Sequence, residues 1–286
     1  MAPPMKDALA LRALGLLPKN MWSRAIGHLA HLRLPEPVAG ATVKGFARLY
    51  GIDVDEAEEP LTAYPSIGAF FTRRLKPGAR PIDRRPGYAV SPADGHILNS
   101  GRLVDGALIQ AKGRDFRVAD LLRDEALGAR FAGGSWVTVY LSPKDYHRVH
   151  HPVEGAITQA RYMPGHLWPV NRLGVEYVDD LFCVNERLAT FVEGPLGLTC
   201  TIMVGATSVG KITTAYDADL QTNQGLPAAD KDYGEGLRVA RGDELGTFHL
   251  GSTAIVLFAN PTVEVLALPE GSAVRMGEPI AQRRGT

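Results

Sequence analysis

The chain has 286 residues, which is enough to bury a sizeable core in one or two domains. Apolar residues make up 45% and charged residues 22%, as in ordinary soluble globular proteins. The 31 basic and 31 acidic side chains cancel, so the net charge gives no support for a nucleic-acid partner. The two cysteines lack CxxC spacing and imply buried thiols rather than a disulfide framework.

The N-terminal segment is both apolar and basic. Residues 1–35 carry five basic side chains and one acidic one, a net charge of +4. Helices are predicted over 7–17 and from Asn20 onward, the second with an apolar stripe that includes Trp22 and Leu29. This stripe either packs on the protein's own core or lies on an anionic membrane. The segment has neither the length of a spanning helix nor the pattern of a signal peptide.

The chain then becomes rich in β-structure. The acidic run 53–59 is predicted to be a solvated loop or helix end, and Ser66 to cap a short helix over 67–75. Short apolar runs separated by Gly and Pro predict a sandwich or barrel. The predicted strands are 89–90, 97–103, 108–111, 136–141, 157–163, 190–192, 198–204, 209–216, 237–248 and 254–259. A small helix is predicted at 118–122 and a long mobile loop at 217–236.

Two short segments near the C-terminus are alike. Residues 241–246 (RGDELG) resemble residues 276–281 (MGEPIA). Two such strand–turn units resemble the barrel-sandwich hybrid of lipoyl-carrier domains. The predicted fold class is therefore α+β and β-rich, with N-terminal amphipathic helices followed by a β-sandwich or barrel that has barrel-sandwich-hybrid-like elements.

The tetrapeptide 250–253 (LGST) lies between two predicted strands. A Gly-Ser pair before an apolar run usually forms a tight bend or bulge. Alternatively, Gly251 holds a strained peptide bond whose carbonyl the Ser252 hydroxyl attacks. The resulting ester can eliminate, which breaks the chain and leaves a dehydroalanine that hydrolyses to a pyruvoyl group. The tetrapeptide alone does not decide between these interpretations.

Residues 140–152 (YLSPKDYHRVHHP) concentrate polar side chains after a predicted strand. Ser142 and Asp145 resemble a capping box, which predicts one turn of helix. His147 and His150 share a face if that turn continues and oppose each other if the chain becomes extended. Three histidines within five residues favour a functional site over a single buried imidazole.

Serine chemistry needs a base to accept the hydroxyl proton and a carboxylate to orient that base. Asp94 lies in a segment, 91–96 (SPADGH), whose ordinary interpretation is a turn. Ser252, one of the two histidines and Asp94 could nevertheless meet at one end of a β-sandwich.

Seven motifs resemble the phosphatidylserine decarboxylase family. They are FFTR at 70–73, RPID at 80–83, PADG at 92–95, YLSP at 140–143, DYHRVH at 145–150, VGA at 204–206 and LGST at 250–253. The resemblance implies that Asp94, His150 and Ser252 form a self-cleavage triad. Cleavage between Gly251 and Ser252 would give a β-chain, 1–251, and an α-chain, 252–286, whose Ser252 becomes the pyruvoyl cofactor. His147 would then protonate the carbanion or hold the substrate carboxylate.

The resemblance also implies a cellular setting. Residues 1–60 would dock the enzyme on an anionic membrane, and residues 61–286 would form the catalytic domain. Phosphatidylserine would be converted to phosphatidylethanolamine through a Schiff base, with no metal and no nucleic acid. We expect a homodimer on the cytoplasmic face of the bacterial inner membrane. One departure is Pro169-Val170-Asn171, where family members often have Ser-Val-Asn.

Two other functions stay open from the residues alone. A metal-dependent hydrolase could use Asp94, His147, His150 and His151, since clustered imidazoles and a carboxylate suit zinc. A lipoyl-like module could bind membranes or partners without catalysis, although the chain lacks the usual lysine at a hairpin tip.

Overall fold

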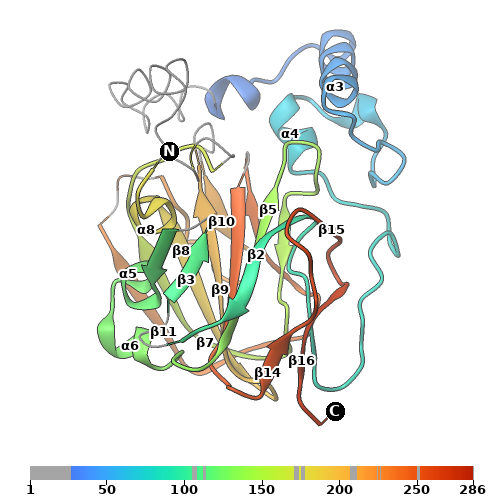
Figure 1. Cartoon of the computed structure of the whole chain (residues 1–286). Coiled ribbons are helices and arrows are strands. Elements are labelled where there is room, and N and C mark those ends of the chain that lie inside the picture. The colour runs from blue at the N-terminus through green and yellow to red at the C-terminus, as the bar shows by residue number, and fades with distance from the viewer. Residues whose placement is uncertain are drawn as a thin grey trace.

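The computed structural model describes residues 27–104, 108–111, 114–170, 174, 178–206, 211–223, 225, 227–249 and 252–285 (Figure 1). The predicted helix over 7–17, most of the helix predicted from Asn20, and the dipeptide 250–251 lie outside these residues. Residues 27–30 are helical, and the chain then continues into the helices that cover one end of the molecule.

A large antiparallel sheet forms the centre of the described structure. Its eight strands lie in the order β11-β7-β8-β9-β13-β5-β2-β15. Their bounds are β2 (Gly95–Arg102), β5 (Ser135–Leu141), β7 (Gly155–Met163), β8 (Arg187–Gly194), β9 (Gly197–Gly205), β11 (Ala229–Val239), β13 (Ser252–Phe258) and β15 (Ala273–Val274). All seven residues of β13 are buried. An apolar strand with both faces covered is typical of a sheet interior, so β13 is the core of the fold.

Three smaller sheets complete the described β-structure. They are β1-β16-β14, β10-β12-β6 and the hairpin β3-β4. Their bounds are β1 (Tyr88–Val90), β3 (Leu108–Ala111), β4 (Arg114–Arg117), β6 (Arg148–His150), β10 (Ile212–Thr214), β12 (Glu244–Phe248), β14 (Val263–Val265) and β16 (Pro279–Arg283). The two similar segments have similar geometry: Gly242 and Gly277 have φ angles of 90° and 91°, and a Cβ on either would meet Ile82 at 2.9 Å.

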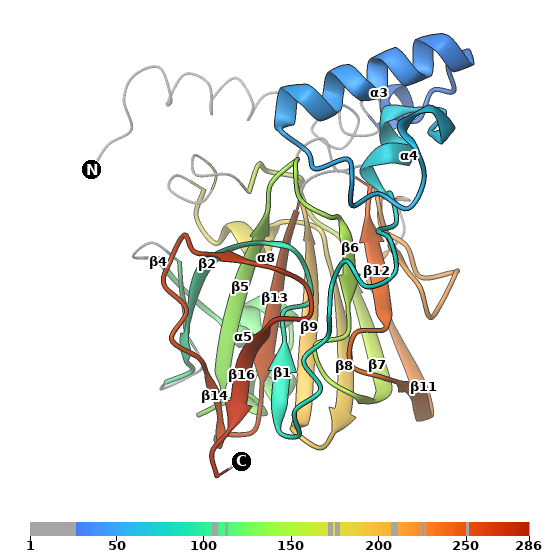
Figure 2. The same ribbon diagram turned by 90° about the vertical axis from the view of Figure 1, so that its right-hand side faces the viewer.

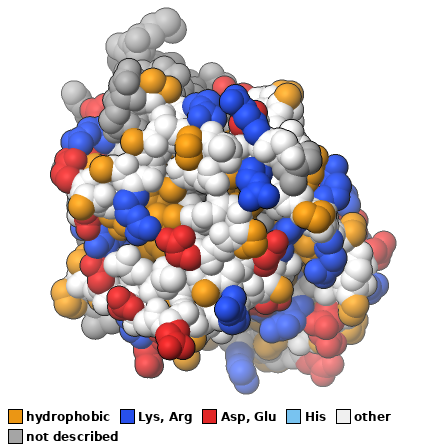
Figure 3. Space-filling view, turned by 90° about the horizontal axis from the view of Figure 1, so that it is seen from below, with side chains coloured by type: hydrophobic (Ala, Val, Ile, Leu, Met, Phe, Trp, Pro, Cys, Tyr) orange, Lys and Arg blue, Asp and Glu red, His pale blue; other side chains and the backbone are white. Residues whose placement is uncertain are grey.

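Helices lie at one end of the sheet and along its side. The described helices are α3 (Glu36–Tyr50), η1 (Leu61–Ala63), α4 (Ile67–Phe71), α5 (Val118–Leu122), α6 (Glu125–Ala129) and α8 (Leu181–Val184). Figure 1 shows α3 and α4 above the sheet, and α5 and α6 beside its lower half. Figure 2 shows α4 between α3 and the strands β6 and β12. The opposite face, seen in Figure 3, carries acidic and basic side chains interspersed. None of the described helices is long and apolar enough to cross a membrane.

The predicted fold class, α+β with a large β-content, is confirmed. Three local predictions are wrong. The loop predicted over 217–236 includes the start of β11, because its polar residues form a strand at the sheet edge. The strand predicted over 237–248 is two strands, β11 and β12, separated by a turn at 240–243. The helix predicted over 67–75 ends at Phe71, where Thr72 is its C-cap.

Candidate active site

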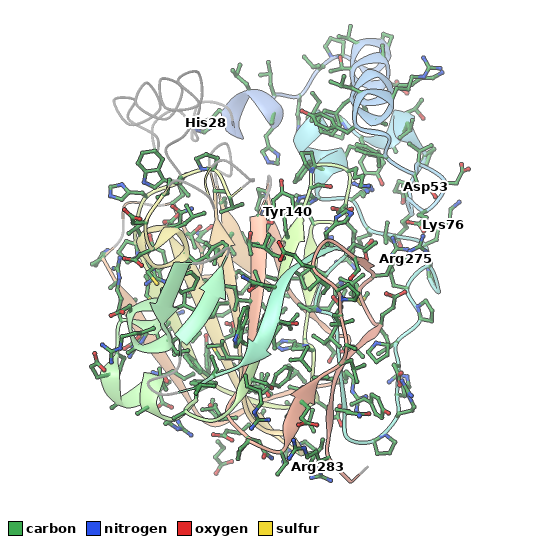
Figure 4. The ribbon with its side chains drawn as sticks, in the orientation of Figure 1. His28, Asp53, Lys76, Tyr140, Arg275 and Arg283 are labelled. Carbon is green, nitrogen blue, oxygen red and sulfur yellow. The ribbon has the colours of Figure 1, made fainter. Side chains whose placement is uncertain are left out.

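Ser252 is the first residue of β13 and lies at the helix-covered end of the sheet. It pairs with Leu141, the last residue of β5, and with Gly205, the last residue of β9. Its neighbour Thr253 pairs with Tyr140, which is labelled at this end in Figure 4. Ser252 is fully buried, and its hydroxyl oxygen has no hydrogen-bond partner within the described structure. A buried hydroxyl without a partner costs free energy, and Ser252 shares this state with the neighbouring Thr253.

The predicted capping interaction between Ser142 and Asp145 is present, but it closes a turn rather than a helix. The Ser142 amide and hydroxyl donate to one Asp145 carboxylate oxygen at 2.7 and 2.6 Å. After this turn the chain extends into β6. His147 and His150 are therefore in the extended arrangement of the two that the sequence allows, which directs them to opposite faces.

His147 is a buried, neutral imidazole with one free nitrogen. Its Nδ1 lies 2.8 Å from the Asp145 carbonyl oxygen, which can only accept, so Nδ1 carries the hydrogen. The bare Nε2 is buried and has no partner among the described residues. Burial lowers the pKa of His147 to about 3, and the positive charge of Arg73 acts in the same direction. His147 is thus uncharged at physiological pH.

Helix α4 and the segment just after it supply two side chains near His147. Ser66 caps this helix by accepting a 3.1 Å hydrogen bond from the Ala69 amide. Phe71, at its last position, places its ring centroid 3.9 Å from that of His147. Arg73 follows two residues later and is only 4% exposed. The helix therefore excludes water from His147 and places a cation near it.

His150 takes its tautomer from the backbone. Its Nδ1 lies 2.8 Å from the Gly242 carbonyl oxygen and therefore carries the hydrogen. Its Nε2 lies 3.2 Å from the hydroxyl of Tyr146, which donates. Burial lowers the pKa of His150 and raises the pKa of Tyr146 to about 12, so the imidazole is a neutral acceptor beside an intact phenol. The sequence predicts that Asp94 orients the imidazole of His150. In this uncut chain the backbone carbonyl of Gly242 orients it instead.

Asp94 is held by an arginine. Its carboxylate accepts from Arg80 at 2.9 and 2.5 Å and from the Met276 amide at 2.9 Å. Arg80 also donates to Glu56 at 2.9 and 2.6 Å. The segment of Asp94 is nevertheless next to His150, whose amide donates to the carbonyl of Pro92 at 2.7 Å. A hydrogen-bonded relay from Asp94 through His150 to Ser252 stays a prediction.

Sequence reasoning missed three contributors to this region. Glu56 lies in the acidic run that was predicted to be merely solvated, yet it shares Arg80 with Asp94. Arg73 and Tyr146 stand inside recognised motifs, but no role was assigned to them. Arg73 could have been identified by its place two residues after a short helix that Ser66 caps and that ends in two phenylalanines. Pairing between Glu56 and Arg80 depends on tertiary contacts that no local pattern predicts.

A cleft of about 240 Å³ opens beside these residues. Its lining includes Arg73, Arg80, Asp94 and Tyr146. Asp53 and Arg275 also line it, and Figure 4 shows both below α3 on the outer side of the molecule. The cleft therefore connects solvent with the buried residues around Asp94.

The donors of the alternative metal site are dispersed. Within the described ranges, no three side chains of His, Cys, Asp or Glu are grouped so that they could hold a metal ion. His151 is fully buried, and neither of its ring nitrogens has a hydrogen-bond partner there. Pro169, the departure from the family pattern, is described, but Asn171 lies outside the described residues.

Comparison with known proteins assigns the family. The family model described as phosphatidylserine decarboxylase matches residues 67–282. A phosphatidylserine decarboxylase proenzyme of Anaeromyxobacter sp. (strain K) is 47% identical over 279 residues, covering 96% of this chain and 99% of the relative. The proenzymes of Myxococcus xanthus and Azotobacter vinelandii are 42% and 43% identical, covering 96% and 97% of this chain and 99% of each relative. The chain therefore belongs to the phosphatidylserine decarboxylase family.

Proposed function

We propose that this chain is a phosphatidylserine decarboxylase proenzyme that cuts itself between Gly251 and Ser252. One observation carries the proposal beyond family membership. The hydroxyl of Ser252 is buried and unpartnered among the described residues, at the end of β13 where the motifs containing Asp94, His147 and His150 converge. The buried hydroxyls of Thr138, Thr199 and Thr253 also lack a partner there, so it is the place of Ser252 beside these motifs that carries the proposal.

Cleavage requires only groups of the chain and water. The Ser252 oxygen adds to the Gly251 carbonyl carbon, and the peptide nitrogen leaves with a proton, which converts the amide to an ester. Loss of the Ser252 α-proton then expels the Gly251 carboxylate and leaves a dehydroalanine. Its enamine tautomerises to an imine, and water replaces the nitrogen as ammonia. The burial of Ser252 suits this sequence, because water that entered early would hydrolyse the ester and restore the serine.

His150 is the proposed base for the Ser252 hydroxyl. The Gly242 carbonyl holds the proton on Nδ1, so Nε2 is the basic nitrogen. In the uncut chain Nε2 accepts from Tyr146, so His150 must release this contact before it takes the serine proton. The carboxylates of Glu244 and Asp94 are nearby negative charges that stabilise the imidazolium once it forms.

The pyruvoyl group, once formed from Ser252, supplies a carbonyl that takes up the substrate amine and withdraws electrons as CO₂ leaves. The residues of the chain position the substrate and move protons. His147 stays neutral under Phe71 and cannot hold a carboxylate through a charge. Of the two roles considered for His147, proton delivery to the substrate carbon therefore fits better: the bare Nε2 first takes up the proton that the substrate ammonium releases and then passes this proton to the carbon that has lost CO₂. An imidazolium in so dry a site gives up its proton readily.

The test of cleavage is a denaturing gel combined with mass spectrometry. We expect two chains without added protease, the smaller one being residues 252–286 with a blocked start, lighter than a serine start by one ammonia. The Ser252→Ala protein should stay intact and release no CO₂ from phosphatidylserine. Cutting of this variant at the same bond would contradict the proposal, as would a wild-type chain that decarboxylates while uncut.

We extend the proposal to a peripheral position on the cytoplasmic face of the bacterial inner membrane. The helical end presents apolar side chains to solvent: Leu29 is 71% exposed, Leu32 56% and Leu49 78%. Exposed apolar side chains gathered at one end are typical of a surface that meets a membrane. This end also covers the site, because His31 packs against Gly68 of α4 and its ring centroid lies 5.6 Å from that of His249.

Vesicle co-sedimentation tests the membrane proposal. Full-length protein should bind anionic vesicles, and a protein starting at residue 36 should bind much less. Salt should weaken the binding without abolishing it, because only the charged part is screened. Equal binding by both proteins would contradict the membrane proposal and would indicate that the N-terminal helices pack on the protein's own core. The proposed homodimer is tested by the sedimentation mass of the detergent-solubilised enzyme, and a mass equal to one protomer would contradict it.

A further inference from the structure

Arg73 is a buried cation whose hydrogen-bonding capacity is largely unused. A guanidinium presents five N–H donors. Here Nη2 donates to the Lys144 carbonyl at 3.3 Å, while Nε and Nη1 are buried with no partner among the described residues. Its guanidinium carbon lies 5.0 Å from the centroid of the Phe70 ring, which contributes a cation–π contact but no counter-charge. A buried, unpaired cation costs several kcal/mol, so an anion is the missing partner.

Arg73 differs from the other cations that line the 240 Å³ cleft. Arg80 is saturated by the carboxylates of Asp94 and Glu56. The side chain of Arg275 is 63% exposed and lies 3.7 Å from Glu56, and Lys144, the remaining basic residue of the lining, is exposed to solvent. Arg73 combines burial, a place in the cleft wall and free donors. These features together describe a site for an anion that the protein itself does not provide.

The backbone that carries Arg73 is fixed in place. The Thr72 carbonyl accepts two hydrogen bonds from Arg148, at 3.1 and 2.9 Å. Arg148 is in turn held by Glu244 at 2.7 Å. These contacts attach the end of α4 to the strands β6 and β12. A preorganised cation binds an anion more tightly than a mobile one, because less conformational entropy is lost on binding.

Phosphatidylserine has two anionic groups, a carboxylate and a phosphodiester, and decarboxylation removes the charge of only one of them. The carboxylate loses its charge as CO₂ departs, so an ion pair with it would stabilise the reactant more than the transition state. The phosphodiester keeps its charge throughout, so an ion pair with it strengthens binding without slowing the chemistry. The dry surroundings of the neutral His147 under Phe71 suit the carboxylate instead, because burial favours the loss of its charge as CO₂ leaves.

We propose that Arg73 binds the phosphodiester of the substrate head group. This inference rests on the proposed function for its substrate, but its geometry is present in the uncut chain. It gives the head group one fixed cation at the wall of the cleft, on the segment that connects α4 to the strands. Arg73 is thus a binding residue whose removal weakens affinity and leaves the chemical step nearly intact.

Steady-state kinetics with a short-chain, monomeric phosphatidylserine test this assignment. We expect Arg73→Gln to raise KM by about 10- to 100-fold, as for the loss of a charged hydrogen-bonded pair, and to change kcat by less than about three-fold. Arg73→Lys should fall between this variant and the wild type, because a lysine keeps the charge but loses the planar fork. Arg74→Gln is the matched control, since that side chain is 63% exposed, and it should change neither constant. A fall in kcat at constant KM would overturn the proposal.

A binding measurement tests the role of Arg73 independently of whether the protein cleaves itself or decarboxylates its substrate. Glycerophosphoethanolamine carries the phosphodiester without a carboxylate, and calorimetry on the Ser252→Ala chain needs neither cleavage nor turnover. Its Kd should rise by about 10- to 100-fold when Arg73→Gln is added. Equal affinity of the two proteins would overturn the assignment, even if the wild type decarboxylates. Loss of affinity would support it, even if the wild type proves inactive.

Discussion

Replacement of His151 by leucine should make the protein more resistant to acid. His151 is fully buried, and neither of its ring nitrogens has a hydrogen-bond partner in the described part of the chain. Burial lowers its pKa to about 4, compared with about 6.5 in an unfolded chain. Between these two values the unfolded chain takes up a proton that the folded chain does not. The free energy of unfolding therefore falls as the pH drops through 6.5 and stops falling below about pH 4.

The size of this effect follows from the two pKa values. Between pH 7.5 and pH 5, the proton taken up by unfolded His151 lowers the free energy of unfolding by about 2 kcal/mol. His151→Leu should lose about 2 kcal/mol less than its parent over the same interval. At pH 7.5 it should be at least as stable, because two unsatisfied nitrogens are removed.

Urea unfolding at the two pH values, on the Ser252→Ala background, measures this difference on a single uncut chain. His28→Leu, the same substitution at an exposed position, is the matched control. An identical loss of stability in His151→Leu and its parent would refute the reasoning. The same substitution in the active enzyme should preserve decarboxylation. An inactive but folded variant would instead favour the metal-site alternative, in which His151 is a ligand.

Two further predictions concern the site. His150→Ala should accumulate uncut chain, whereas His147→Ala should still cut but release little CO₂; equal cutting by both variants, seen on a denaturing gel, would refute the proposed division of roles. Arg80→Gln should lower the melting temperature and slow self-cleavage by about ten-fold or more, because Asp94 loses its main partner and its position. Glu56→Gln is the control variant: it leaves the ion pair between Arg80 and Asp94 intact and should slow self-cleavage less than Arg80→Gln does. The rate of self-cleavage of each variant is compared with that of the wild type on a denaturing gel.

The sequence predicts β13 well because local and global preferences agree there. Residues 254–258 are apolar and largely β-branched or aromatic, and all are fully buried in the sheet. The sequence predicts a loop over residues 229–236, the larger part of the polar strand β11, because this strand lies at the sheet edge, where its acidic and basic side chains stay exposed. Charged residues on an edge strand limit pairing with other chains, but they also remove the apolar pattern by which a strand is recognised.

Helix α3 shows why propensity alone is insufficient. Its sequence, EPVAGATVKGFARLY, contains two glycines and several β-branched residues, which are weak helix formers. The helix is held by tertiary packing of Val43 and Ala47 in a small core with Tyr64 and Phe70. Such packing joins segments about 20 residues apart and cannot be deduced from a local window.

The candidate site was predictable in its residue types but not in its partners. The motifs indicated Asp94, His147, His150 and Ser252, and the structure brings their segments to one end of the sheet. Hydrogen bonding was not predictable, because it depends on backbone groups such as the Gly242 carbonyl and on the arginine that Asp94 engages. The choice between the helical and the extended arrangement of the two histidines likewise depends on the pairing of β6 with β12.

The position of β13 has a consequence for the life of the protein after it is cut. Cleavage before Ser252 leaves a 35-residue chain whose first strand is hydrogen-bonded on both sides to strands of the large chain. The same small chain also supplies β15, which pairs with β2, and β16, which pairs with β1 on one side and with β14 of the small chain on the other. The two products are thus interwoven, and separating them removes the middle of the sheet. If the mature enzyme unfolds, its two chains must find each other again before they can refold. The precursor therefore folds once as a single chain, and the lifetime of the mature enzyme depends on how slowly it unfolds.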